Sequence, residues 1–112
     1  MVTKDKIQEW KNAYGEVYEI TVTNEDQKGN PIVPGGKKEY KSYHKKIGKK
    51  TLSYAAQRSG GMTDPIKFNE AIVVSTFLEG DEEIKTTGEF INAAADQLQE
   101  FIQQAEAKVK KL

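Results

Sequence analysis

The chain has 112 residues, equal numbers of basic and acidic side chains (17 each) and 37% hydrophobic residues, a profile that fits one domain with a modest core. It has no cysteine, which excludes disulfides, thiolate catalysis and cysteine-ligated zinc or iron–sulfur sites. No apolar run is long enough to span a bilayer, and the N-terminal residues lack the hydrophobic region of a secretory signal. We therefore expect a soluble, cytoplasmic protein with no membrane partner.

The charge is balanced overall but divided between the two halves of the chain. Residues 1–56 hold 11 lysines and 7 acids, a net charge of +4, whereas residues 57–112 hold 6 basic and 10 acidic residues, a net charge of −4. Two clusters dominate: a basic strip over residues 37–50, with seven lysines and one glutamate, and an acidic turn, EGDEE, over residues 79–83. Opposite blocks of this kind can pair within one fold, between copies, or with another protein.

The first fifteen residues predict a short helix. Ile7, Trp10 and Tyr14 recur at helical spacing, so they share one face. Thr3 can cap the start of this helix, and Gly15 can end it in the left-handed conformation.

Residues 16–48 predict a β-hairpin with a long loop. The stretches 17–23 (VYEITVT) and 39–45 (EYKSYHK) alternate with period two and are rich in β-branched and aromatic residues, as strands are. Residues 24–38 between them carry two prolines and three glycines and predict an extended loop. Sequential strands usually neighbour each other, so the two strands are expected to pair.

Residues 49–112 predict three helices. The first, over 51–59, is stopped by two glycines, and the second begins at Asp64-Pro65, an N-cap followed by proline, and continues to about residue 78. An acidic loop over 79–85 leads to the third helix, which is expected to start at the capping box formed by Thr86 and Glu89.

The last helix is expected to be the longest element. Its apolar residues repeat at alternating threes and fours, and polar residues occupy its other faces; the stripe is Ile91, Ala94, Leu98, Phe101 or Ile102, Ala105, Val109 and Leu112. We expect residues 91–102 to pack on the domain's own core, and the far end to frame a subunit contact or to fray. The fold class is therefore α+β, a single domain over residues 1–112: a helix (1–15), a hairpin with a long loop (16–48) and a helical part (49–112).

No pattern of catalytic or metal-binding residues stands out. The segment 48–51 (GKKT) looks like the end of a phosphate loop, but tyrosine occupies position 43, where that motif needs a glycine. His44, the single histidine, has no spaced carboxylate or second imidazole, and we expect it to be solvated on its strand. The acidic turn lacks the ligand spacing of a calcium loop. We therefore expect no catalytic residue, no cofactor and no metal.

Binding of single-stranded nucleic acid is an alternative that the basic strip raises. Tyr40, Tyr43 and Tyr54 lie among or close to its lysines, and single strands are held by cations together with aromatic rings. The neutral chain, its single arginine (Arg58) and its acidic second half argue against this reading. Lysines that keep a sheet edge soluble would give the same local pattern.

Several short motifs follow one another in a definite order. A strand after Tyr14-Gly15 and an aromatic, basic strand precede K-T-L-S-Y-A at Lys50–Ala55, D-P-I-K-F at Asp64–Phe68 and L-E-G-D-E-E-I-K at Leu78–Lys85. This order resembles that of small tail-assembly-chaperone-like proteins of tailed bacteriophages, over about residues 14–112. Two features depart from the family: the loop 24–38 is long, and K-K-I-G-K-K stands where a proline-containing basic turn is expected.

The resemblance implies a non-enzymatic role. Such chaperones coat the hydrophobic, helical tape-measure protein before the tail polymerises, keep it soluble and help to recruit tail-tube subunits. The candidate partner-binding residues lie on the basic strip, the acidic turn and the terminal stripe: Lys45, Lys46, Lys49, Lys50, Asp81, Glu82, Glu83, Phe101, Ile102, Val109 and Leu112. The basic strip and the acidic turn can also mate between copies in a homo-oligomer. A generic protein-binding adapter of a phage or bacterium is the other protein-binding hypothesis.

Overall fold

Helix α1 (Lys4–Tyr14) begins and ends where the sequence predicts. The computed structural model describes residues 2–61, 63–100 and 110–112. Thr3 Oγ1 accepts a hydrogen bond from the Lys6 backbone N–H (3.2 Å), so the N-cap is formed. Gly15 has a φ of 88° and donates its N–H to the carbonyl of Lys11, which closes the last turn. Trp10 is the buried residue of this helix.

The chain then forms a three-stranded antiparallel sheet in the order β1-β2-β3. Strands β1 (Val17–Thr23) and β2 (Glu39–Lys45) have the predicted bounds and pair over their full length. Strand β3 (Phe77–Gly80) pairs with the other side of β2. β2 is therefore the central strand, and the expectation that its lysines protect a sheet edge is wrong.

The strand β3 corrects the prediction that a helix continues to about residue 78 and is followed by an acidic loop. Helix α3 (Pro65–Thr76) ends earlier, because the backbone becomes extended at Phe77 (φ −63°, ψ 126°). In the last turn of α3, the hydroxyls of Ser75 and Thr76 donate hydrogen bonds to the backbone carbonyls of Ala71 (2.6 Å) and Ile72 (2.8 Å). The next four residues supply the ladder partner that β2 needs on its second edge.

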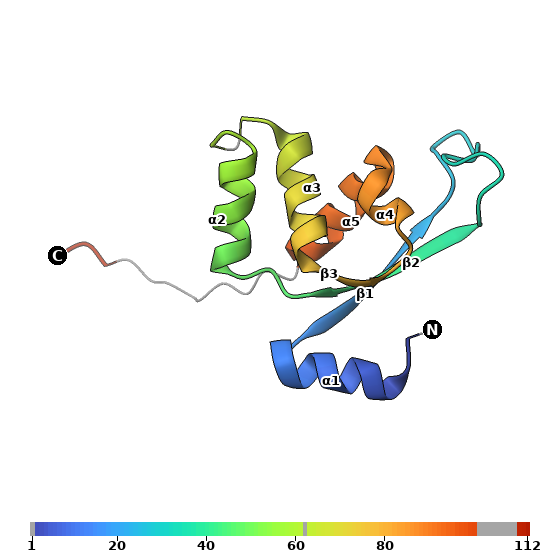
Figure 1. Cartoon of the computed structure of the whole chain (residues 1–112). Helices are drawn as coiled ribbons and strands as arrows, with labels where there is room; N and C mark the ends of the chain where they lie inside the picture. Colours follow the sequence, from blue (N-terminus) through green and yellow to red (C-terminus); the bar gives the residue numbers. More distant parts are fainter. Residues whose placement is uncertain (1, 62, 101–109) are drawn as a thin grey trace.

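The two faces of the sheet are covered unequally. Helix α1 lies on one face, and the other face carries α3, α4 (Glu83–Thr86) and α5 (Gly88–Glu100), with α2 (Lys49–Arg58) beyond α3 (Figure 1). The main core lies between the sheet and these helices; its members include Ile20, Val22, Tyr40, Ile72, Val73, Ile84, Phe90, Ile91, Ala94, Ala95 and Leu98. None of the helices in the described part of the chain is long and apolar enough to cross a membrane.

The helical half follows its sequence signals with small shifts. The Asp64 carboxylate caps α3 by accepting from the backbone N–H groups of Ile66 and Lys67, each at 3.1 Å. The capping box expected at Thr86 and Glu89 does not begin the last helix, because Thr86 is the last residue of α4. Helix α5 begins at Gly88, and its first turn is closed by a hydrogen bond from Ile91 to the carbonyl of Thr87 (2.9 Å).

The terminal stripe is confirmed over α5, the longest described element. Ile91, Ala94 and Leu98 are all buried. The predicted contact residues Phe101, Ile102 and Val109, and Ala105 with them, lie outside the described residues. Residues 110–112 are described without regular secondary structure, and Leu112 is fully exposed.

His44 corrects a further expectation, because it is fully buried rather than solvated. Its Nδ1 lies 2.9 Å from Thr76 Oγ1, and its Nε2 lies 2.7 Å from Ser42 Oγ. The hydroxyl proton of Thr76 goes to the carbonyl of Ile72, so Thr76 accepts a hydrogen bond from Nδ1–H. Nε2 is then the acceptor from Ser42. The ring is neutral in this arrangement, and burial lowers the pKa of His44 to about 4.

This network predicts acid sensitivity. In the unfolded chain His44 takes up a proton near its ordinary pKa of about 6.5, whereas in the fold it does so only near about 4. Its contribution to stability is therefore complete above pH 6.5 and is lost as the pH falls towards 4, a change of about 3 kcal/mol. Urea unfolding between pH 7 and pH 4 should show this loss. A His44→Gln variant should be less stable at pH 7 and should lack the decline between these values; an unchanged decline would contradict the assignment.

Gly80 predicts a local packing constraint. It has a φ of 145°, and an added Cβ would lie 2.5 Å from the carbonyl oxygen of Lys41 and 2.5 Å from Cα of Ser42. We expect Gly80→Ala to cost about 2 kcal/mol or more, because β3 must move away from β2. Gly88→Ala is the control, since no atom lies within 4 Å of its added Cβ, and it should leave stability unchanged or raise it slightly. Thermal melts of the two variants measure the difference.

Candidate functional site

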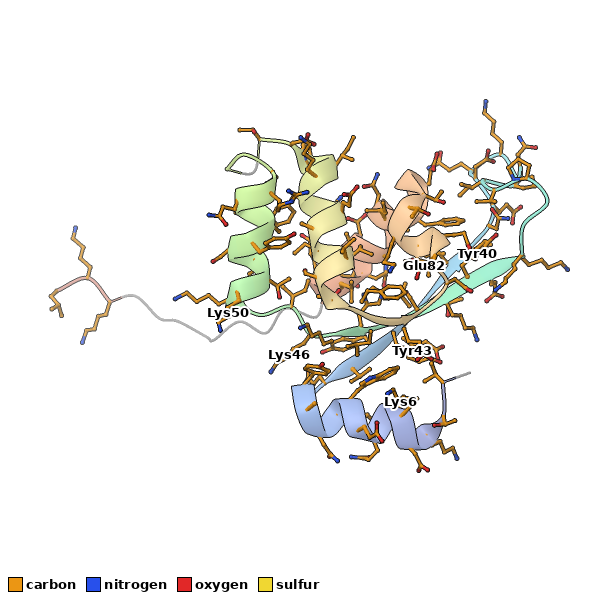
Figure 2. The ribbon with its side chains drawn as sticks, in the orientation of Figure 1. Lys6, Tyr40, Tyr43, Lys46, Lys50 and Glu82 are labelled. Carbon is orange, nitrogen blue, oxygen red and sulfur yellow. The ribbon has the colours of Figure 1, made fainter. Side chains whose placement is uncertain are left out.

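The basic strip and the acidic turn contact each other only near the beginning of β2, where Asp81 bonds to Lys37 and Lys41. Lys46, Lys49 and Lys50 are exposed after the end of β2 and at the start of α2, whereas the acidic turn lies near the beginning of β2. Figure 2 shows this separation, with Lys46 and Lys50 on one side and Glu82 near Tyr40 on the other. Lys45 is half-buried, and its Nζ lies 5.2 Å from the centre of the Tyr14 ring. The structure therefore does not gather the predicted charged residues into one site.

Asp81 is held within its own chain. Its carboxylate accepts from Lys37 Nζ and from the backbone N–H of Lys41, each at 2.8 Å. Partial burial alone would raise the pKa of Asp81, but these two hydrogen bonds outweigh it and hold the pKa below its usual value. Part of the charge complementarity seen in the sequence is thus satisfied inside the fold.

The other two acids of the turn also have local roles. Glu82 forms an ion pair with Lys85 (2.9 Å), three residues later. Glu83 is half-buried and opens α4, where a negative charge interacts favourably with the helix N-terminus. The acids of the turn therefore interact mainly with neighbouring groups of the same chain.

The three tyrosines near the basic strip do not share a surface. Tyr40 is buried and packs against Phe90, with ring centres 5.1 Å apart. Tyr43 points to the opposite face of the sheet, where it contacts Trp10 (5.8 Å). Tyr54 is on α2, with 46% of its surface exposed. They offer no continuous platform on which successive bases could stack.

An open groove lies between α2 and α3. It has a volume of about 250 Å³ and is lined by Tyr54, Arg58, Lys67, Glu70, Ala71 and Val74. Tyr54 and Val74 keep 46% and 47% of their surface exposed, and Ile66, one turn before Glu70 on α3, keeps 64%. These are three of the five large hydrophobic side chains that are exposed in the described part of the chain, so apolar surface is concentrated on this helix pair.

The two helices are fixed to each other by the connection between them. Gly60 and Gly61 both adopt positive φ (63° and 76°), which reverses the chain directly after α2. The Ser59 carbonyl then accepts from the backbone N–H groups of Thr63 and Asp64, each at 3.1 Å. α2 contacts the rest of the fold mainly through α3 and stands at one end of the molecule (Figure 1), which leaves the groove open to solvent.

Basic residues outnumber acidic residues in the groove and on the neighbouring face of α2. Arg58 and Lys67 lie on its walls, and Lys49 and Lys50 lie with Tyr54 on the outer face of α2. Glu70 is the single acid among the groove residues. Two of the predicted partner-binding residues, Lys49 and Lys50, therefore lie on the helix that forms one wall of this groove, which the sequence analysis did not identify.

A sequence signal for the groove was present in α3. Ile66, Glu70 and Val74 recur every four residues and so lie on one helix face, which is distinct from the buried face of Ile72 and Val73. The sequence alone does not show that this face is exposed, because its exposure depends on how α2 packs against α3.

Among the described residues, no group of three or more histidine, cysteine, aspartate and glutamate side chains is placed to hold a metal ion. Comparison of the chain with protein-family models, with curated proteins and with solved structures found no match.

The Asp81 contacts predict unequal effects of their removal. Asp81→Ala removes a charge-assisted hydrogen bond to the Lys41 backbone as well as the ion pair, and should cost about 1 kcal/mol or more. Lys37→Met removes only an ion pair of an exposed lysine, which solvent screens, and should cost clearly less than Asp81→Ala. Denaturant unfolding at neutral pH compares the two. Equal losses would mean that the backbone contact contributes nothing.

Proposed function

We propose that this chain is a non-enzymatic, tail-assembly-chaperone-like protein that binds an amphipathic helix of a tape-measure protein in the α2–α3 groove. The observation that carries the proposal is the exposed apolar surface of Tyr54, Ile66 and Val74 on that helix pair. A groove between two helices is a common receptor for the apolar face of a third.

The chemistry of the groove supports a client of a particular kind. Its apolar side chains would meet client residues at positions i, i+3 or i+4, and i+7, the spacing of a helix face. The surrounding Arg58, Lys67, Lys49 and Lys50 favour acidic residues along the borders of that face. A tape-measure protein, being long and helical, offers many such segments.

The expected strength of binding also suits a chaperone. Burying the exposed part of each of the three apolar side chains contributes roughly 1 kcal/mol. Their sum, less the cost of association, gives weak binding at any single site. Weak contacts repeated along one client keep it soluble and allow release when the tail polymerises.

Co-expression with the tape-measure protein encoded by the same phage genome tests the proposal. The wild-type chain should raise the soluble fraction of the client several-fold over the client alone. Val74→Asp should abolish most of that increase, because it puts a charge in the groove without disturbing a buried residue.

Two control variants sharpen the experiment. Tyr14→Asp introduces the same charge at an exposed aromatic residue of α1 and should preserve client solubility. Leu112→Asp tests the terminal stripe: if it removes the effect while Val74→Asp does not, the client binds there and not in the groove. A client equally soluble with and without the chain would refute the chaperone role.

A further inference from the structure

The outer side of β1 is an unpaired sheet edge. Within the described residues, the strand order β1-β2-β3 gives β1 a partner on one side only. Its register with β2 continues over seven residue pairs without a shift, so the edge is regular. Natural sheets commonly protect such edges with proline, lysine or a bulge, and Val17–Thr23 contains none of these. The opposite edge, β3, is only four residues long, and its pairing with β2 shifts between Tyr43 and His44.

The hydrogen-bond pattern identifies the backbone groups that face outward. Asn24 donates its N–H to the carbonyl of Lys38 (2.8 Å), and these two residues continue the β1–β2 register. Because opposed residues alternate between bonded and non-bonded pairs, every second residue before Asn24 is bonded to β2. The residues between them turn their N–H and C=O groups to the free edge: Val17, Glu19, Thr21 and Thr23. The backbone of these four makes no hydrogen bond there with any described residue.

A trench runs beside this edge, between β1 and the flank of α5. It encloses about 460 Å³ and is lined by Ile20, Thr21, Val22, Thr23, Glu25, Ile32, Glu89, Phe90, Ala93, Asp96 and Gln97. Three of these residues are acids, and no lysine or arginine is among them. The trench therefore combines free strand hydrogen-bonding groups, an apolar floor and negative charge.

We propose that the β1 edge and this trench bind an extended segment of a partner protein that carries lysine or arginine at every second position. The backbone of the segment would continue the sheet as a fourth strand next to β1. Its alternate side chains would point towards α5, where their aliphatic stems pack along Ala93 and their charges reach Glu89 and Asp96. The remaining side chains would lie beside Thr21 and Thr23 on the solvent side.

A second copy of this chain fits the edge less well. Two-fold pairing of β1 with itself would bring Glu25, Glu89 and Asp96 of both copies to the same seam, and like charges so close are unfavourable. A basic segment meets no such repulsion. The trench is also separate from the α2–α3 groove, so this inference does not depend on the proposed function.

Fluorescence anisotropy with two labelled, end-blocked heptapeptides tests the inference. In one, lysine alternates with threonine; in the other, glutamate replaces lysine. We expect the lysine peptide to bind and the glutamate peptide to bind at least tenfold more weakly. A double variant, Glu89→Lys with Asp96→Lys, should reverse this preference. Glu9→Lys, which makes the same change in charge as either single substitution but on α1, should alter the affinity less than twofold.

A proline variant and amide hydrogen exchange distinguish strand addition from charge attraction alone. Thr21→Pro removes an outward N–H and leaves the β1–β2 ladder intact, so it should weaken the lysine peptide at least fivefold while the melting temperature stays close to wild type. In the wild type, the peptide should slow amide hydrogen exchange at Glu19, Thr21 and Thr23. Unchanged affinity in Thr21→Pro together with unprotected amides would reduce the contact to charge attraction and overturn the strand model. Protection of these amides without peptide, together with a dimer in light scattering, would assign the edge to a second copy.

Discussion

The central strand β2 is the constraint on which the rest of the molecule depends. It is hydrogen-bonded to β1 along one edge and to β3 along the other, and its side chains alternate between two differently covered faces. Ser42 and His44 point to the helices and join Thr76 of α3 in a buried chain of hydrogen bonds. A buried polar group without a hydrogen-bond partner would destabilise the fold. The need to pair these side chains therefore helps to set where α3 ends and how it lies on the sheet.

Local pattern explains which parts of this fold could be predicted. The bounds of β1 and β2 follow from strict alternation, and the start of α3 follows from Asp64-Pro65, because each signal is contained in the residues that form the element. The end of α3 is different. Phe77 and Leu78 continue an apolar run that fits a helix equally well, and the groups of β2 that favour the extended conformation lie more than thirty residues earlier in the chain.

The candidate surfaces were harder to predict for the same reason. The burial of His44 depends on Thr76, a residue that reaches it only through the tertiary fold. The lysines of β2 appeared to mark an edge, whereas the true long edge is β1, whose sequence VYEITVT carries no lysine at all. Exposure of Val74 likewise depends on how far α2 covers α3. Composition located the charged clusters correctly along the chain, but composition does not say which of them face one another.

The two open surfaces differ in charge, although the chain as a whole is neutral. The charged residues of the α2–α3 groove are mainly basic, whereas those of the β1–α5 trench are all acidic. A single segment cannot satisfy both, since an acidic amphipathic helix would be repelled by the trench and a basic extended strand by the border of the groove. The surfaces also differ in what forms them: the groove lies between two helices, while the edge is a single strand that is held by a full ladder and presents one register. The proposed binding of a helix in the groove and of a strand at the β1 edge would therefore not compete for the same residues.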